Sequence, residues 1–364
     1  MHKEKQNFRS LNLSDEMMTQ VNDLKASMSE EELFRRMADS ICPEIYGMEE
    51  VKQALLLLMV GGVGKHMKDG MKIRGQINAL LMGDPGVAKS QLLKHISTFA
   101  PRGIYTTGKG SSGVGLTAAV IRDKTTGEVV LEGGALVLAD NGICCIDEFD
   151  KMDERDRTNI HEVMEQQTIS IAKAGITTSL NARTSILAAA NPVYGRYNKA
   201  LKPHENINLP AALLSRFDII FLLLDEAEVN KDRMLAKHVT QVHTSMRAPV
   251  NDANMQVPAD VMRSFIALAQ KHEPTIPASL HQYVVAKYVE KRQLQRDGRE
   301  ELSYMYVTPR TLLGIIRISQ SIAKFHFRDQ VTQADVDMAI RLMDYSLKTL
   351  GNLTKDSKTR RGSK

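Results

Sequence analysis

A strand–turn–helix motif between residues 79 and 98 constrains the fold more than any other part of the chain. The apolar run 79–82 meets a glycine-rich turn, and an amphipathic helix begins at Lys89. Successive backbone N–H groups and the helix dipole converge on an anion in such a turn. Lys89 would reach the β- and γ-phosphates of a nucleotide, and the Ser90 hydroxyl would ligate Mg²⁺. The motif therefore predicts a phosphate-binding loop.

The turn departs from the P-loop pattern G-x-x-x-x-G-K-[ST] at Ala88, which stands where the second glycine belongs. One methyl group is compatible with phosphate binding if the φ angle of Ala88 is negative, while Gly83 and Gly86 supply turn freedom. An ordinary strand-to-helix turn is the alternative. The residues expected to contact the nucleotide are Gly83, Asp84, Pro85, Gly86, Val87, Ala88, Lys89 and Ser90.

Length and composition describe an ordinary globular protein. The chain has 364 residues, of which 43% are hydrophobic and 25% charged, enough for one large or two modest domains. No apolar run approaches the ~18–20 residues that a transmembrane helix needs. Residues 1–5 are polar and show no signal-peptide pattern. We therefore expect no membrane partner.

Cysteine content and net charge limit the cellular compartment and the classes of partner that the chain could have. Three cysteines fit a reducing compartment, and the adjacent Cys144 and Cys145 favour core packing on opposite faces of a strand over a metal site or disulfide. The ten histidines show no paired metal-ligand spacing. A net charge of +5 permits a nucleic-acid partner without proving one. Because aromatic residues make up only 5% and tryptophan is absent, contacts to phosphates are favoured over base stacking.

Two carboxylates follow a second apolar run. Residues 142–146 read as a buried strand that delivers Asp147 and Glu148 at its carboxyl end, where α/β sheets place ligands. Asp147 would hold Mg²⁺ through water, and Glu148 would orient and polarise the attacking water. A solvated acidic turn is the alternative.

Three further polar residues are candidates, each with a plainer alternative. Asn191 ends the buried run 184–190 and could hydrogen-bond the γ-phosphate or the lytic water, or simply form an Asn-Pro turn. Arg216 precedes a strand at 219–224 on an exposed turn and could reach a neighbouring molecule's phosphate, or form a surface salt bridge. Tyr46 could pack against a nucleotide base, or be a buried structural tyrosine.

The remaining pattern predicts hairpins, then helices. Residues 118–131 and 168–181 read as β-hairpins, the second with Lys173 at its tip. A capping box at Ser29 opens a helix that Pro43 ends, and a second helix covers 49–60. Beyond residue 228 the apolar period becomes 3.6, which predicts helices at about 229–245, 259–272, 279–295, 309–325 and 332–347. We expect four regions: a linker and N-terminal helix (1–34), an ATPase core (35–247), a helical lid (258–348) and a disordered basic tail (349–364).

These parts, in this order, resemble the ATPase core of the minichromosome maintenance (MCM) replicative helicases of the AAA+ superfamily. The similarity covers roughly residues 30 to 348, and segments 105–119 and 209–216 resemble one subunit type of the eukaryotic heterohexamer in particular. The motifs that carry it are Gly83-Asp-Pro-Gly-Val-Ala-Lys-Ser90, Ile146-Asp-Glu-Phe-Asp-Lys-Met152, Ile171-Ala-Lys-Ala-Gly175 and Leu214-Ser-Arg-Phe-Asp218.

The resemblance implies an α/β fold, an AAA+ P-loop αβα sandwich with β-hairpin insertions followed by a small α-helical lid. It implies ATP and Mg²⁺ as cofactors, with Asp147 and Glu148 as the Walker B pair, Asn191 as sensor 1 and Tyr46 near the base. Arg216 and Arg310 would be the arginine finger and sensor 2, acting on a neighbour's nucleotide. Lys173 would face DNA. The implied partners are DNA and other MCM subunits in a hexameric ring, in the nucleus.

The chain departs from the family in extent, since no counterpart of the N-terminal zinc-containing domain or of the winged helix is visible, so we expect a fragment. Two other functions fit parts of the pattern. One is an AAA+ remodeller with a protein or small-molecule client; DNA stimulation of the ATPase would separate the two. The other is a structural ring subunit with little turnover, against which Lys89, Asp147, Glu148 and Arg216 weigh.

Overall fold

The computed structural model of the chain describes residues 8, 14–70, 72–109, 113–122, 129–173, 176–198, 206, 209–225, 227–245, 256–296 and 307–351. Parts of several expected features lie outside these residues: the two hairpin turns at 123–128 and 174–175, the linker at 246–255 and the tail at 352–364.

A five-stranded parallel sheet forms the centre of the molecule. Its strand order is β11-β3-β10-β7-β4, and every neighbouring pair is parallel. Such sheets are buried on both faces, which explains the continuous apolar runs in the sequence. The strands are β3 (Ala79–Gly83), β4 (Gly103–Thr107), β7 (Ile143–Asp147), β10 (Ser185–Ala190) and β11 (Ile219–Leu223).

The two faces of the sheet belong to two hydrophobic cores. Cys145 packs in the core that contains α3 (Glu49–Val60) and α4 (Lys89–Phe99). Cys144 packs in the other, with α7 (Glu154–Gln166) and the short α9 (Ala211–Leu214). Both thiols are fully buried, which confirms that the adjacent cysteines point to opposite faces of a core strand.

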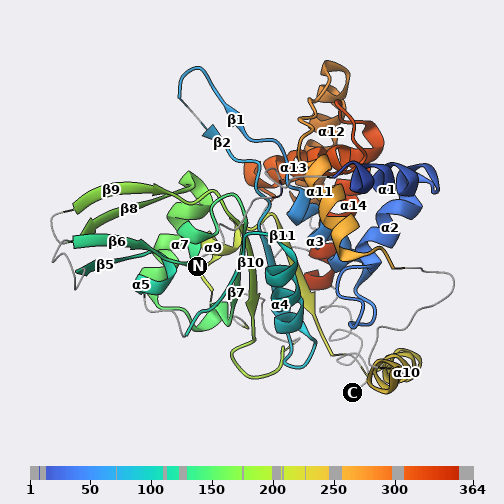
Figure 1. Cartoon of the computed structure of the whole chain (residues 1–364), viewed down its shortest axis with the longest axis horizontal. Helices are drawn as coiled ribbons and strands as arrows, with labels where there is room; N and C mark the ends of the chain where they lie inside the picture. The colour runs from blue at the N-terminus through green and yellow to red at the C-terminus, as the bar shows by residue number, and fades with distance from the viewer. Residues whose placement is uncertain are drawn as a thin grey trace.

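A helical half packs beside the first core, at the right of Figure 1. Apolar side chains from its amino- and carboxyl-terminal helices share one cluster with α3, and the rings of Phe34 and Phe325 meet edge to face at 5.1 Å between centroids. The helices are α1 (Asp15–Ala26), α2 (Glu30–Asp39), α11 (Ala259–Ala269), α12 (Ala278–Arg296), α13 (Pro309–Phe325) and α14 (Gln333–Gly351).

The helix boundaries follow their caps. Ser29 accepts a hydrogen bond from the backbone N–H of Glu32 at the start of α2, which is one half of the predicted capping box. Thr308 forms a capping box ahead of Pro309 in α13. Two expected ends are wrong. Helix α2 stops at Asp39, before Pro43 exerts any effect, and α11 stops at Ala269 rather than near 272. Helix α14 continues into the expected tail, to Gly351.

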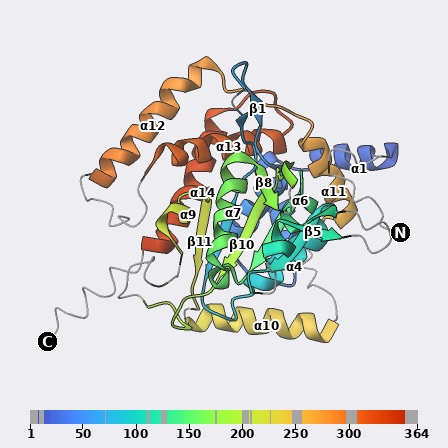
Figure 2. The same cartoon turned by 90° about the vertical axis from the view of Figure 1, so that its left-hand side faces the viewer.

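Three antiparallel hairpins project from this body. The predicted pair, β5–β6 and β8–β9, extends to one side of the sheet, away from the lid helices (Figures 1 and 2). A third, β1–β2, was not predicted and projects above the sheet in Figure 1. Their strands are β1 (Lys65–His66), β2 (Lys72–Ile73), β5 (Ala118–Arg122), β6 (Val129–Gly133), β8 (Thr168–Lys173) and β9 (Ile176–Asn181).

The connecting elements are short, with one exception. Helices α5 (Gly113–Leu116) and α6 (Ala135–Leu138) and the 3-10 turn η2 (Phe149–Lys151) lie between strands. Helix α10 (Val229–Ser245) is long and lies apart from the other helices in Figure 1. Among the described residues, no helix combines the length and apolar character needed to cross a bilayer.

Candidate nucleotide-binding site

The sheet register brings the predicted phosphate and carboxylate residues to one edge. Strands β3, β7 and β10 are parallel, and Ala190 pairs with Met82 while Ala188 pairs with Ile146. The chain therefore leaves these strands at the same carboxyl edge, into the P-loop, Asp147–Glu148 and Asn191. This is the edge at which open α/β sheets bind ligands.

Backbone geometry at the P-loop explains both glycines and corrects the expectation for the alanine. Gly83 has a φ angle of +144°, and a Cβ there would lie 1.8 Å from the carbonyl oxygen of Leu223, so only glycine fits. Gly86 also has a positive φ angle, +91°. Ala88 has a φ angle of +59°, so the negative angle on which we made the compatibility of its methyl group conditional is not present. The alanine therefore adopts a left-handed conformation that normally favours glycine, as the N-terminal cap of α4.

Lys89 is buried inside the turn that it follows. Its Nζ donates to the carbonyl oxygens of Gly83 at 2.7 Å and Asp84 at 2.6 Å. Burial lowers the pKa of Lys89 to about 8, against the opposing pull of Asp84, Asp147 and Asp150. The ammonium group is thus held over the loop, where the negative charge of phosphates would strengthen its protonation.

Asp84 shapes the loop, although it was predicted as a nucleotide contact. Its carboxylate accepts hydrogen bonds from the backbone N–H groups of Tyr197 at 2.8 Å and Asp225 at 3.2 Å. Its own N–H donates to Leu223. The carboxylate is therefore turned away from an incoming phosphate and ties together segments that follow three different strands.

The acidic pair is held by a tyrosine that the sequence analysis missed. Asp147 is buried, and its carboxylate accepts hydrogen bonds from the Tyr105 hydroxyl and from the Glu148 backbone N–H, both at 2.9 Å. Burial, and then the hydrogen bond to Asp147, raise the pKa of Tyr105 to about 12, so the tyrosine remains a donor. The sequence held one signal for this contact. Side chains alternate along β4, so Tyr105 lies on the same face as Thr107, which pairs with Asp147.

Glu148 and Asn191 flank Asp147 and differ in how they are held. The Glu148 carboxylate is partly exposed and accepts from Lys151 at 2.7 Å. The backbone N–H of Asn191 donates to the Asp150 carboxylate at 3.0 Å, which links Asn191 to the turn after β7. The oxygens of Ser90 and Asp147 are the ligand type that Mg²⁺ prefers, so these residues fit the predicted metal.

Arg216 and Arg310 come together on a third residue, Glu165 of α7. One carboxylate oxygen of Glu165 accepts from Arg216 Nε at 3.1 Å and from Arg310 Nη2 at 3.0 Å. Arg310 also donates to the Ser215 hydroxyl at 2.9 Å. The predicted alternative for Arg216, a salt bridge, is therefore present in the isolated chain, and its side chain is half-buried rather than on a fully exposed turn.

The arginine pair lies at the opposite end of the sheet from the P-loop. Arg216 precedes β11, whose last residue, Leu223, pairs with Gly83. The strand from Ile219 to Leu223 spans roughly 13 Å at ~3.3 Å per residue. Helix α7, which begins after the acidic pair and carries Glu165 near its end, gives a similar separation of roughly 16 Å at 1.5 Å per residue.

Asp218 fixes this end of the molecule. Its side chain is 3% exposed and forms ion pairs with Arg74 and with Arg317 of α13, and it accepts from the Asn78 backbone N–H. Burial lowers the pKa of Arg317, while Asp218 opposes that effect. A core residue thereby anchors the helix that presents Arg310.

The two remaining predicted residues lie away from these clusters. Tyr46 is 36% exposed, so it is not the buried structural tyrosine of the alternative interpretation. Its hydroxyl contacts the Met234 sulfur at 3.1 Å, and its ring lies 5.5 Å from that of His238, both on α10. Lys173 ends strand β8, beside the hairpin turn.

Comparison with known proteins agrees with this geometry. Residues 20–243 match the family model described as the MCM P-loop domain, and residues 260–347 match the MCM AAA-lid domain. The chain belongs to the MCM family. Its parallel sheet, P-loop and helical lid are those of the AAA+ αβα fold that the sequence predicted.

Several MCM relatives are similar over most of the chain. The chain is 62% identical to "DNA replication licensing factor mcm7" of Schizosaccharomyces pombe, over 87% of this chain and 42% of the relative. It is 58% identical to MCM7 of Arabidopsis thaliana, over 86% of this chain and 44% of the relative. For mcm7-B of Xenopus laevis the identity is 54%, over 96% and 47%.

These relatives all carry the name of the seventh subunit, which is the subunit type that segments 105–119 and 209–216 resemble. The chain spans less than half the length of the curated MCM relatives that it matches.

Proposed function

We propose that this chain is the ATP-hydrolysing part of a DNA-unwinding MCM subunit that works in a ring with other MCM subunits in the nucleus. One observation carries the proposal: the catalytic groups are divided between two ends of the same sheet. The P-loop and acidic pair lie at the carboxyl edge, whereas Arg216 and Arg310 gather at the amino edge. Such a division supports a site that a second subunit would complete.

The carboxyl edge would bind ATP and Mg²⁺. The backbone of residues 83–90 and the Lys89 ammonium would hold the phosphates, with Ser90 and Asp147 providing oxygen ligands for the metal. Glu148 would exchange its pairing with Lys151 for the attacking water and act as the general base. Asn191 would contact the γ-phosphate, and Tyr46 the base.

The amino edge would act on a neighbour's ATP. Hydrolysis concentrates negative charge on the γ-phosphoryl oxygens, and a guanidinium brought from outside stabilises that charge. The two arginines share one carboxylate oxygen of Glu165 in the isolated chain. A neighbour's triphosphate carries a larger negative charge than Glu165, so it would attract both arginines more strongly.

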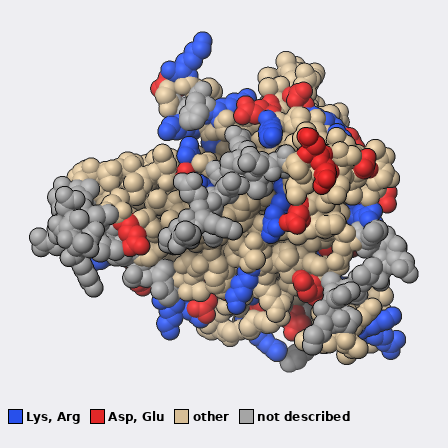
Figure 3. Space-filling view, in the orientation of Figure 1, with Lys and Arg blue, Asp and Glu red and all other residues tan. Residues whose placement is uncertain are grey.

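The β8–β9 hairpin would transmit the movement caused by ATP hydrolysis to DNA. It follows α7 directly and precedes β10, which ends at Asn191. The backbone bond from Ala182 N–H to the Gln167 carbonyl closes the base of the hairpin at 2.8 Å, so it can move as a unit. Lys173 beside its turn would hold a DNA phosphate. The β1–β2 hairpin adds exposed Lys65, Lys68 and Lys72. Lysine and arginine side chains cover the part of the molecule that projects upward in Figure 3, where this hairpin lies in Figure 1.

The proposal is tested with the protein that carries this chain, assembled with the other MCM subunits. Glu148→Gln should retain ATP binding and stop hydrolysis at this site, while Lys89→Ala should abolish nucleotide binding there, because it removes the main cation from a site that holds three phosphates. Single-stranded DNA should stimulate ATPase activity in the wild-type ring. Wild-type turnover by Glu148→Gln would contradict the proposed base, and absence of DNA stimulation would favour a protein or small-molecule client.

A further inference from the structure

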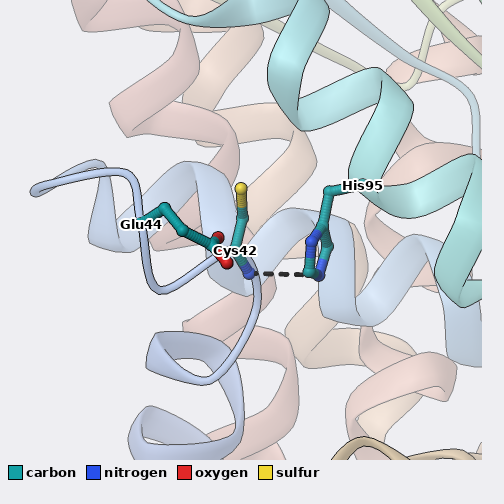
Figure 4. Close-up of side chains that lie close together, drawn as sticks. All are labelled: Cys42, Glu44 and His95. Carbon is teal, nitrogen blue, oxygen red and sulfur yellow. Dashed lines mark hydrogen bonds between the residues drawn. The ribbon is translucent and has the colours of Figure 1, made fainter. Parts of the chain in front are cut away.

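A thiol, a carboxylate and an imidazole meet outside the nucleotide site. Cys42 and Glu44 belong to the loop between α2 and α3, and His95 belongs to α4 (Figure 4). Their candidate ligand atoms all lie within 4.8 Å of one another. The proposed roles of the P-loop, the arginine pair and the hairpins use none of these three groups.

We propose that Cys42, Glu44 and His95 bind one Zn²⁺ ion and leave its fourth position open to water. Thiolate, imidazole and carboxylate are the three ligand types that zinc accepts, at roughly 2.0–2.3 Å. Tetrahedral coordination at those lengths places ligand atoms roughly 3.3–3.8 Å apart, so the present cluster needs to contract by about 1 Å. Glu44 is exposed and can supply most of that movement.

Zinc binding at this cluster would have to displace one proton, from Cys42. Burial, and then Glu44, raise the pKa of Cys42 to about 12, so the metal-free residue is a neutral thiol. Burial lowers the pKa of His95, which keeps its imidazole neutral and its lone pair available. That lone pair, on Nε2, now accepts the Cys42 backbone N–H at 3.2 Å, so zinc would have to take the place of this hydrogen bond. Zinc binding would replace the thiol proton, as it does wherever cysteine ligates this metal.

Two positive groups oppose the ion, and each is paired with carboxylates. Besides burial, Lys52 and Arg263 both lower the pKa of His95, and Arg263 forms an ion pair with Asp260. Lys52 interacts electrostatically with Cys42 and Glu44, and also with the carboxylates of Asp39 and Glu49. Its Nζ donates to the Ile45 carbonyl at 2.9 Å rather than entering the cluster. Mg²⁺ is disfavoured here because it demands six oxygen ligands, so the site is distinct from the metal position at the P-loop.

A bound ion would connect two parts of the nucleotide site. Glu44 lies two residues before Tyr46, and His95 lies on the helix that begins with Lys89. Zinc would cross-link the loop that carries the tyrosine to the helix that carries the lysine. Cys42, at a φ angle of +49°, already holds the loop in a left-handed bend that brings it to α4.

The test uses the full chain without nucleotide and measures metal binding directly. Co²⁺ serves as the spectroscopic probe, Zn²⁺ as competitor and Mg²⁺ as a control ion. The variants are Cys42→Ala, Glu44→Gln and His95→Ala. Glu49→Gln is a matched control, because Glu49 is an exposed carboxylate near Lys52 that lies outside the cluster.

We expect one equivalent of Co²⁺ to bind with a thiolate-to-cobalt charge-transfer band, displaced by Zn²⁺ and not by Mg²⁺. Cys42→Ala should remove the band, and Glu44→Gln, at an exposed position that does not threaten folding, should weaken binding by at least ~10-fold, since even second-shell changes cost 10- to 100-fold. His95→Ala should weaken binding by more than this, and Glu49→Gln should equal the wild type. Absence of a charge-transfer band, or equal affinity in wild type and Glu44→Gln, would overturn the site.

Discussion

Removing the guanidinium of Arg216 should silence a neighbouring subunit and leave this chain's own nucleotide binding unchanged. Arg216 precedes β11, and the strand that separates it from the P-loop edge spans roughly 13 Å. Arginine fingers contribute about 10³–10⁵ in rate, so Arg216→Ala should reduce hydrolysis at the neighbour's site by that factor.

The substitution should not unfold the chain. Arg216 pairs with a glutamate that is 52% exposed, and exposed ion pairs contribute about 0–1 kcal/mol to the free energy of unfolding. Glu165 also keeps its second partner, Arg310. Arg183→Ala is a matched control, because Arg183 forms a comparable ion pair with Asp140 on another part of the surface.

The assay isolates the neighbour's contribution. A ring assembled with Lys89→Ala in this chain has no activity from this chain's own P-loop, so the site that this chain's arginine completes can be followed on the neighbour. Adding Arg216→Ala should abolish that activity, and adding Arg183→Ala should preserve it. In parallel, ATP affinity of the isolated chain is measured for Arg216→Ala alone. Loss of ATP binding by the isolated chain would place Arg216 in its own site and refute the reasoning.

Three other predictions concern single residues. Because the pKa of Lys89 is lowered to about 8 and bound phosphates should raise it, ATP affinity should fall as pH rises above ~8, with proton uptake seen by calorimetry in two buffers; constant affinity up to pH ~9.5 would contradict this. Tyr105→Phe should weaken Mg²⁺-dependent ATP binding and lower the free energy of unfolding by about 1.5 kcal/mol in urea titrations, because Asp147 loses a donor; unchanged Mg²⁺ dependence would refute it. Lys173→Ala should keep basal ATPase and abolish unwinding, and should flatten the plot of log affinity against log salt by about 0.7 per subunit on single-stranded DNA, equally for all sequences; wild-type unwinding and slope would return Lys173 to the solvated surface.

Local patterns predicted most of the fold. The hydrophobic period located helices α3, α10 and α13 to the residue. Ser29 marked the start of α2, because capping is decided by residues near in sequence. Apolar runs followed by polar residues also located the carboxyl-edge site, since all the strands of the sheet are parallel.

Local sequence patterns could not predict contacts between segments that are distant in the sequence. Nothing local to Glu165 indicates that two arginines, 51 and 145 residues away, share its carboxylate. The cluster of Cys42 and His95 is similar, because those residues are 53 positions apart and join only when the loop meets α4. The sequence also did not indicate the positive φ angle of Ala88, because alanine seldom adopts the left-handed conformation that this turn requires.

The shared oxygen of Glu165 has a consequence for how a ring could assemble. Exposed ion pairs contribute only about 0–1 kcal/mol, so both arginines can leave Glu165, and a competing anion of higher charge would hold them more strongly. A triphosphate offers more negative charge than a diphosphate at the same position. In the proposed ring, the contact between subunits would include an exchange of counter-ions, and its strength should follow whether the neighbour holds ATP or ADP. In this arrangement, the neighbour's anion has to attract the two arginines more strongly than Glu165 does.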